Sequence, residues 1–336
     1  MKIHVPALPL LLSALLTAPA NAQSALLLVT NQKDHNVSLV DPETDRQIAT
    51  IAEDRVTGHE IAASTDGRHA FVPIYGDAGV GRAGTDGREM IVLDIPARKI
   101  SGTVDFGRGV RPHCPILRNG KLYVTTELNQ TVSVIDPNTL KIVGAIPTGQ
   151  PESHMLALSH DGGRGYTANV GPGTVSVLDM KARKLVTVIP VSPKIQRISV
   201  SNDDSRVFTS DVTQPRLAVI NTSTDKVESW VPLPGNGYGT ASTRDGRTLL
   251  VAIPTQGKVV AIDLATLKVV RSLDVPSAPQ EILVRPDGRE AFVSCNVSHK
   301  IAVIDLAQWK VKTLIDVGNG ADGLAWFDAG HSVASR

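Results

Sequence analysis

The chain has 336 residues, of which 42% are hydrophobic, 4% aromatic and 20% charged, a composition that excludes a disordered protein. Lys and Arg number 34 against 33 Asp and Glu, so no overall attraction to nucleic acid or to an anionic membrane is expected. The length exceeds that of a usual single domain but allows one closed all-β array.

The N-terminus predicts a signal peptide. A short positive start precedes an apolar run at 7–16, and Ala20-Asn21-Ala22 fits the small-x-small rule of signal peptidase. We predict a signal peptide over residues 1–22 and a periplasmic or secreted mature chain. The alternative is an uncleaved anchor, but the run is short for a bilayer span. No later segment is long and apolar enough, so no transmembrane segment is expected in the mature chain.

Two sequence marks recur along the rest of the chain. An aliphatic residue followed by Asp or Asn recurs at spacings of 53, 42, 43, 42, 42 and 42 residues. Its members are Asp41, Asp94, Asp136, Asp179, Asn221, Asp263 and Asp305. A turn mark beginning with Asp or Asn recurs at Asp66, Asn119, Asp161, Asp203, Asp245 and Asp287. Two marks with one period indicate a repeat architecture.

Each repeat predicts four short strands. In the unit that starts at Ser153, the strands expected are Met155–Ser159, Gly165–Asn169, Val175–Asp179 and Lys184–Pro190, separated by turns rich in Gly and Asp. Four short strands in about 40 residues are typical of a β-propeller blade.

The two ends of the repeat array predict a closed ring. Ala25–Asn31 matches a second strand without a first, and Gly323–Phe327 matches a first strand with nothing after it. The last segment can therefore complete the first blade and remove the open edge. The predicted fold is an all-β, seven-bladed β-propeller over residues 23–328, followed by a C-terminal tail at 329–336.

Three second strands resemble the signature of the YVTN-repeat β-propeller family. They are Leu28–Asn31, Tyr123–Thr126 and Tyr166–Asn169, and Val132–Thr139 matches the strand and turn that follow. The resemblance covers the whole predicted mature chain and implies the fold. Relatives are mostly exported proteins of bacteria or archaea. Similar propellers include lactonases, lyases and domains of redox enzymes, so the resemblance does not choose a function.

The start of each first strand is expected to form a ring around one mouth of the central channel. Counting seven residues back from the turn mark gives His59, Pro112, His154, Gln196, Tyr238 and Gln280, and extending the period gives Asp322. In the third repeat the following turn is one residue shorter, so His113 is expected to replace Pro112.

Three consecutive blades would then present His59, His113 and His154 to one axis. Three imidazoles with an open position suit a divalent transition metal. Glu60 and Glu152 are the candidate catalytic carboxylates, as base or as support for the metal ligands. The alternative is that these histidines only bond backbone groups or channel water.

The other ring positions, together with a neighbouring arginine, are the predicted ligand-binding residues. They are Gln196, Arg197, Tyr238, Gln280 and Asp322. Three arginines expected near the mouth, Arg111, Arg197 and Arg285, would favour an anionic ligand unless solvent surrounds them.

The second repeat carries 11 extra residues between its second and third strands, around 75–88. This insertion is expected on the face of the ring, either as a lid over the mouth or as a tolerated surface loop. The two cysteines, Cys114 and Cys295, fall in blades well apart around the ring, so a disulfide between them is not expected.

Three functions remain open from the sequence. The first is an exported binding protein that holds a small ligand, a metal or a protein partner at the channel mouth. The second is a metal-dependent lactonase, hydrolase or lyase that uses the His ring. The third is nucleic-acid binding, against which the near-zero net charge argues. Because the sequence contains no complete catalytic constellation, it favours the binding protein. The only cofactor it suggests is a divalent transition metal.

Overall fold

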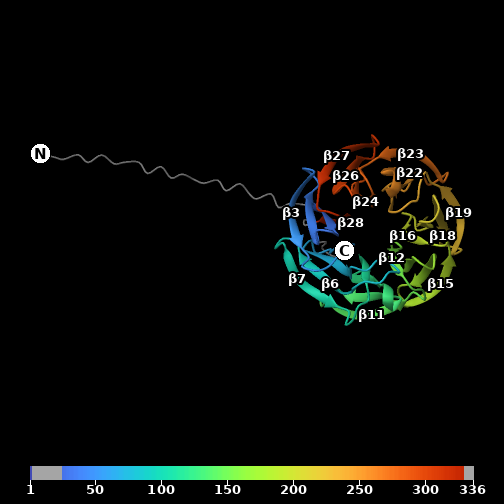
Figure 1. The fold of residues 1–336 in the computed structure, drawn as a ribbon, viewed down its shortest axis with the longest axis horizontal. Helices are drawn as coiled ribbons and strands as arrows, with labels where there is room; N and C mark the ends of the chain where they lie inside the picture. Colours follow the sequence, from blue (N-terminus) through green and yellow to red (C-terminus); the bar gives the residue numbers. More distant parts are fainter. Residues whose placement is uncertain (2–24, 329–336) are drawn as a thin grey trace.

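A computed structural model describes residue 1 and residues 25–328. The predicted tail at 329–336, and the predicted signal peptide apart from Met1, lie outside the described residues. The described chain forms seven four-stranded antiparallel sheets arranged around a central channel (Figure 1). The predicted seven-bladed β-propeller is confirmed.

The strands of the first three blades follow the predicted order. Blade one contains β28 (Ala321–Asp328), β1 (Ala25–Asn31), β2 (Asn36–Asp41) and β3 (Arg46–Ala52). Blade two contains β4 (Ala62–Ala63), β5 (His69–Gly76), β6 (Asp86–Asp94) and β7 (Lys99–Asp105). Blade three contains β8 (Pro112–Arg118), β9 (Lys121–Thr126), β10 (Thr131–Asp136) and β11 (Lys141–Pro147).

The remaining four blades repeat the same order from the channel outward. Blade four contains β12 (Ser153–Leu158), β13 (Arg164–Asn169), β14 (Thr174–Asp179) and β15 (Lys184–Pro190). Blade five contains β16 (Ile195–Val200), β17 (Arg206–Asp211), β18 (Arg216–Asn221) and β19 (Lys226–Pro232). Blade six contains β20 (Thr240–Ser242), β21 (Thr248–Ile253), β22 (Lys258–Asp263) and β23 (Lys268–Asp274). Blade seven contains β24 (Pro279–Val284), β25 (Glu290–Cys295), β26 (Lys300–Asp305) and β27 (Lys310–Asp316).

The C-terminal strand closes the ring. β28 pairs antiparallel with β1, with Leu28 opposite Ala325 and Leu26 opposite Phe327. Phe327 is 1% exposed and belongs to a hydrophobic cluster shared by blades one and two. Sequence ends that are almost 300 residues apart therefore build one blade, as their complementary half-repeats predict.

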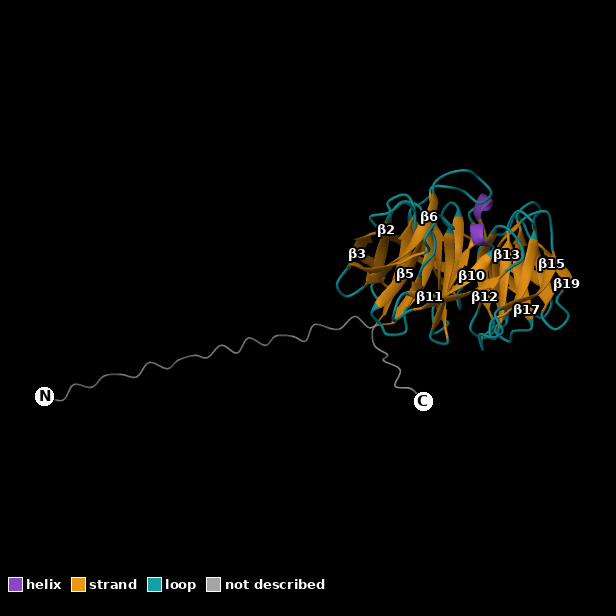
Figure 2. Ribbon diagram, turned by 90° about the horizontal axis from the view of Figure 1, so that it is seen from below, coloured by secondary structure: helices purple, strands orange, loops and turns teal. Residues whose placement is uncertain are grey.

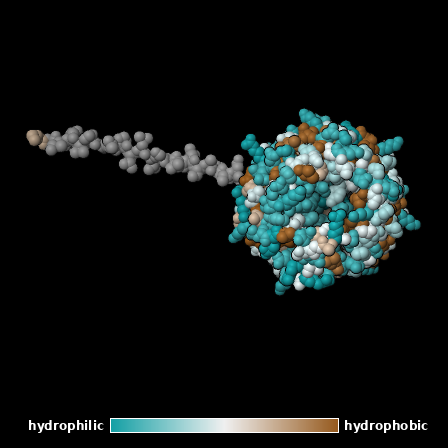
Figure 3. Space-filling view, in the orientation of Figure 1, coloured by the Kyte–Doolittle hydropathy of each residue, from teal (hydrophilic) through white to brown (hydrophobic). Residues whose placement is uncertain are grey.

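The core lies between neighbouring blades. The second and third strands of each blade are buried along most of their length, whereas the outer strand alternates between buried and exposed positions. Between blades five and six, for example, Phe208 packs with Leu249 and Val251. On the outside, hydrophobic residues are scattered among hydrophilic ones on the face in view (Figure 3).

The recurring Asp is explained by the turn after the third strand. Asp179 Oδ1 accepts a hydrogen bond from the Ala182 backbone N–H at 2.8 Å. In blade five Asn221 Oδ1 accepts from the Ser223 N–H at 2.9 Å in the same way. Only the acceptor oxygen is needed, so an amide can replace the carboxylate at this position.

The loops between second and third strands lie on one face of the ring, together with two short 3₁₀ helices, η1 (Glu127–Asn129) and η2 (Pro254–Gln256). Figure 2 shows both helices, in purple, on the upper side. Among the residues that the structure describes, no helix has the length and hydrophobicity needed to cross a membrane.

Candidate functional site

A cavity of about 300 Å³ lies at the mouth of the channel on this face. Eleven of its lining residues carry a hydrogen-bonding side chain. They are Gln32, His59, Tyr75, His113, His154, Gln196, Arg197, Tyr238, Gln280, Asn296 and Asp322. Ala78, Gly79 and Val80 complete the wall.

The structure brings most of the predicted site residues together here. The three predicted metal ligands, His59, His113 and His154, all line the cavity, and so do all five predicted ligand-binding residues. His113, rather than Pro112, occupies the third-blade position.

The two predicted catalytic carboxylates lie in different places. Glu60 is 4% exposed and sits against Arg197, behind the cavity wall. Glu152 is not part of the wall. Its Oε2 accepts a hydrogen bond from the Gly171 N–H at 2.7 Å, in a surface turn of blade four.

The blade-two insertion covers part of the cavity. Its residues Ala78–Val80 line the wall, and Arg111 fixes the loop from below. Arg111 Nη1 donates to Gly79 O at 3.1 Å, Nη2 donates to Arg82 O at 2.8 Å, and Nε pairs with Asp86 at 2.6 Å. The loop is therefore a cover that one buried arginine holds in place.

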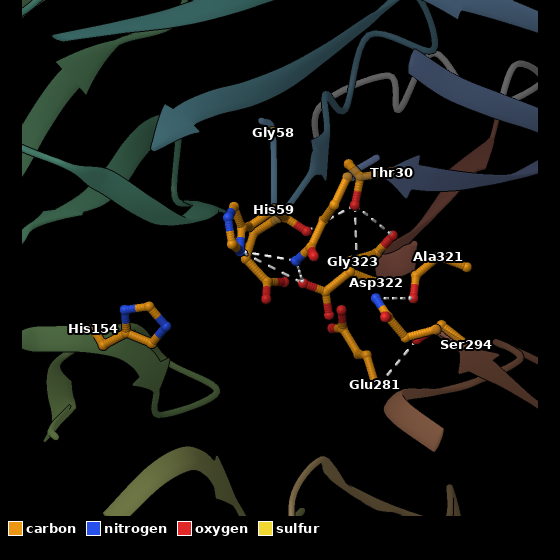
Figure 4. A network of polar contacts seen from close by, with 12 residues as sticks. Thr30, Gly58, His59, His154, Glu281, Ser294, Ala321, Asp322 and Gly323 are labelled. Carbon is orange, nitrogen blue, oxygen red and sulfur yellow. Dashed lines mark hydrogen bonds and ion pairs between the residues drawn. The ribbon is translucent and has the colours of Figure 1, made fainter. Parts of the chain in front are cut away.

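Hydroxyl groups of the second strands hold the ring residues of the next blade. Thr30 Oγ1 donates to His59 O at 2.7 Å (Figure 4). Thr125 Oγ1 does the same to His154 O at 2.7 Å. This gives the threonine of the repeated second-strand signature a structural role, because it places the ring backbone from the neighbouring blade.

Bulges at the start of the first strands turn two successive residues toward the channel. The pairing register shifts between Ile195 and Ile198, and again between Pro279 and Ile282. A bulge re-aims side chains that regular pleating would send to opposite faces. It explains why Gln196 and Arg197 line the cavity together.

One side of the cavity is an aromatic and imidazole cluster. The rings of His113 and His154 lie 3.6 Å apart between centroids, and His59 lies 5.3 Å from His113. Glu127, which is 2% exposed, accepts a hydrogen bond from the Tyr75 hydroxyl at 2.8 Å and a short one from His154 Nδ1. His154 is thereby oriented, with Nε2 as its remaining nitrogen.

His59 is held in one tautomer by Gln32. The Gln32 amide Nε2 donates to His59 Nδ1 at 2.9 Å and also to Asp322 Oδ2. Since Nδ1 accepts, the proton of the neutral ring lies on Nε2. Burial, together with the charges of His154 and Arg197, lowers the pKa of His59 to about 3, which keeps this ring neutral.

The opposite side of the cavity is organised around Arg197. Its Nη1 pairs with Glu60 Oε1 at 2.5 Å and its Nη2 with Asp322 Oδ1 at 3.0 Å. Its guanidinium carbon lies 5.0 Å from the centre of the Tyr238 ring. Burial opposes the charge of Arg197, but the carboxylates around it raise its pKa above the ordinary value.

Three carboxyl groups share this one arginine. Burial raises the pKa of Glu60 well above its usual range, and it also raises the pKa values of Glu281 and Asp322. The charge of Glu281 adds to the rise in the pKa of Glu60, because neighbouring carboxylates disfavour each other's ionisation. Figure 4 shows Glu281 beside Asp322.

The arrangement does not present a ready metal site. No group of three His, Cys, Asp or Glu side chains among residues 25–328 is placed to hold a metal ion. Burial and the nearby charges of His154, His59 and Arg197 lower the pKa of His113 well below its usual range. The three predicted ligands line one cavity, but the described side chains form no metal-ligating group, so a metal there stays a prediction.

Two of the three arginines expected near the channel mouth are engaged in other contacts. Arg285 lies beside the Asp287 turn, away from the cavity, and pairs with Glu43, Asp287 and Glu290. Arg111 is occupied by Asp86 and the covering loop.

Five residues that the structure places in or behind the cavity wall are not predicted from the sequence. Gln32, Glu127 and Asn296 each stand one residue after a second strand, a position that the repeat period could have marked. Tyr75 lies near the end of the longer β5 strand. Glu281 follows Gln280 and faces the channel through the bulge, which has no mark in the sequence.

Both cysteines are buried free thiols. Cys114 Sγ lies 3.6 Å from Leu156 O, and burial raises the pKa of Cys295 to about 12. Neither is part of the cavity wall.

Comparison with solved structures finds several propellers of the same architecture. Hydrazine synthase of Kuenenia stuttgartiensis matches with a TM-score of 0.72 and 19% identity, over 84% of this chain and 92% of that chain. The dihydro-heme d1 dehydrogenase NirN, in complex with DHE, matches with a TM-score of 0.65 and 16% identity, over 94% of this chain and 78% of that chain. A functionally unknown protein from Desulfotomaculum acetoxidans matches with a TM-score of 0.75 and 15% identity, over 90% and 99%.

At these identities the similarity shows the fold alone. No curated protein sequence matches the chain. A family model does match blades six and seven together with the closing strand β28. Residues 235–332 match the YNCE-like beta-propeller, a propeller of YVTN-like repeats, and the whole described chain is a seven-bladed propeller.

Proposed function

We propose that this protein is an exported binding protein that holds a small polar molecule in the cavity at the channel mouth. The observation that carries the proposal is the cavity wall, in which eleven side chains offer hydrogen-bonding groups under a fixed loop. Convergent polar groups in a covered concave site are typical of small-molecule recognition. Export rests on the predicted signal peptide, and a mature chain starting at Gln23 is the expected form.

A rigid ring suits binding without rearrangement. The Thr30 and Thr125 hydroxyls fix the backbone of two ring histidines from neighbouring blades, and Arg111 fixes the cover. A pre-organised site spends less free energy on ordering its own groups when a ligand binds.

A thermal-shift screen of small metabolites tests the proposal, with Gln196→Leu as the site variant. The Gln196 amide lines the cavity and donates only to the Tyr238 hydroxyl at 2.9 Å. Gln308→Leu, in an exposed turn outside the cavity, is the matched control. Compounds that raise the Tm of wild type and of the control, but not of Gln196→Leu, support the site. If none stabilises wild type, or if all act equally on Gln196→Leu, the proposal fails.

The second candidate is an enzyme, and the Glu127–His154 pair favours it. A carboxylate that accepts from Nδ1 orients an imidazole for proton transfer at Nε2. The metal-dependent form, a lactonase, hydrolase or lyase, needs a metal on His59, His113 and His154. Elemental analysis of wild type, His59→Ala and His154→Ala tests it. If wild type carries no stoichiometric metal and binds none on titration, the metal-dependent form is excluded.

A further inference from the structure

The carboxylate and the guanidinium of the cavity wall neutralise each other. Arg197 and Asp322 form an ion pair at 3.0 Å, and Arg197 also pairs with the buried Glu60. The lining residue His154 pairs with the buried carboxylate of Glu127. The other Asp322 oxygen accepts from the Gln32 amide. No carboxylate or guanidinium of the described wall is therefore left over for a counter-ion on the ligand.

The free hydrogen-bonding capacity of the wall belongs to uncharged groups of both kinds. His59 presents a donor at Nε2, because Nδ1 accepts from Gln32. Gln196 and Asn296 use their amide nitrogens on Tyr238 and on a backbone carbonyl, which leaves their amide oxygens as acceptors. A ligand that both donates and accepts over its whole surface matches this wall, as hydroxyl groups do.

The aromatic rings of the wall do not offer a stacking slot. The Tyr75 ring is surrounded by His59, His113 and His154 at 5.1, 5.4 and 5.8 Å between centroids. The Tyr238 ring is covered by the Arg197 guanidinium at 5.0 Å. A planar ligand would compete with these ring and guanidinium contacts for the aromatic faces, so the wall favours a saturated molecule.

The cavity is small and closed on one side. Its volume of about 300 Å³ is at the lower end of small-molecule sites, and the loop at Ala78–Val80 limits its opening. From the paired charge, the mixed donors and acceptors and the covered rings, we propose that the ligand is a neutral, saturated polyhydroxy compound of about monosaccharide size. This inference rests on the binding function proposed above.

Isothermal titration calorimetry on the mature full chain tests it with matched compounds. The neutral set is glucose, galactose, mannose and myo-inositol. The charged set is glucuronate and glucosamine, and adenosine is the neutral planar compound. Gln280→Leu removes one amide of the wall, and Gln308→Leu serves as control. We expect at least one neutral polyol to bind 10-fold or more tighter than its charged congener and than adenosine. That binding should weaken at least 10-fold in Gln280→Leu only.

The outcomes separate this inference from the binding function itself. If a charged congener, adenosine or a non-polyol compound found in the thermal-shift screen binds tighter than every polyol and is lost in Gln280→Leu, the ligand class is wrong and the binding function stands. If neither the polyols nor any screened compound depends on the cavity residues, both proposals fail.

Discussion

Glu53 is a buried carboxyl group near the start of the segment that leads to His59. It is 0% exposed, and its Oε2 accepts a hydrogen bond from the Gly58 N–H at 3.0 Å. Its other oxygen has no hydrogen-bond partner among the described residues. Burial raises the pKa of Glu53 from 4.5 to about 7. The folded protein therefore holds a proton that the unfolded chain releases more easily.

This predicts a pH-dependent stability that Glu53→Gln removes. Because the folded pKa is the higher one, the stabilising contribution of the protonated group is complete below about pH 4.5 and is lost as the pH rises through 7. The shift in the pKa of Glu53 corresponds to a contribution of about 3 kcal/mol at most to the free energy of unfolding. Urea unfolding at pH 5 and pH 8 should show a smaller difference for Glu53→Gln than for wild type. The control is Glu228→Gln, at a surface ion pair with Arg206, which should keep the wild-type difference in stability between the two pH values. If Glu53→Gln shows that same difference, Glu53 is not its source.

At the residue scale the sequence predicts the residues that surround the channel mouth, but not the buried Glu281 next to them. The period alone places His59, His154 and Asp322 at one mouth, and the structure agrees. Glu281 could not be found that way, because strict alternation in a strand would send it to the opposite side from Gln280. The bulge at Pro279–Ile282 overrides alternation, and no residue type marks it.

At the element scale the recurring Asp fixes a turn. Asp179 accepts from the Ala182 N–H at 2.8 Å, and an amide fills the same role at Asn221. Strand bounds in this blade could be predicted closely: β15 is Lys184–Pro190 as expected, whereas β12 begins at Ser153, two residues before the prediction. The difference arises at the bulge, where pairing is irregular between Ser153 and Met155.

Replacing Asp179 by Ala should therefore destabilise the protein, whereas Asp179→Asn should not. The alanine variant loses the acceptor for the Ala182 N–H, a hydrogen bond worth about 1 kcal/mol. The asparagine variant keeps an acceptor oxygen, as Asn221 does naturally. Urea denaturation of the three proteins provides the measurement. Equal losses for both variants would show that the charge, rather than the acceptor, matters.

Arg111 is an anchor of the cover over the cavity. Arg111 bonds the carbonyls of Gly79 and Arg82, and Arg82 itself is exposed. In Arg111→Ala we expect trypsin to cleave after Arg82 several-fold faster than in wild type, because the loop loses its anchor. Arg55→Ala, which removes an exposed ion pair with Glu89, is the control. Unchanged cleavage in Arg111→Ala would show that the loop is held by other contacts.

At the scale of the whole molecule, one strand completes the ring. The pairing of β28 with β1 was predictable because the two sequence ends are complementary halves of one repeat. What the sequence could not supply is the contact across the channel at Arg197 of blade five. The ion pairs of that arginine join it to Glu60 of blade two and Asp322 of blade one, more than 100 positions away.

A chain that ends at Gly320 should lose this closure. It lacks β28 and the buried Leu324 and Phe327, and it leaves one edge of β1 unpaired. We expect a Tm lower by about 10 °C or more, with oligomers in size-exclusion chromatography. The comparison is a chain ending at Asp328, which keeps the whole strand. If the two chains unfold at the same temperature, the ring does not depend on its closing strand.

The bulges at the channel mouth also bear on how such a protein can diverge. In blade five the bulge brings two adjacent side chains, Gln196 and Arg197, to the cavity, and Gln280 lines it at the corresponding position of blade seven. A single substitution at Gln196 or Gln280 can therefore alter ligand preference while the scaffold of repeated turns persists. A gene built by duplicating one 42-residue unit would acquire recognition one blade at a time, so paralogues of one shape can be selective for different molecules.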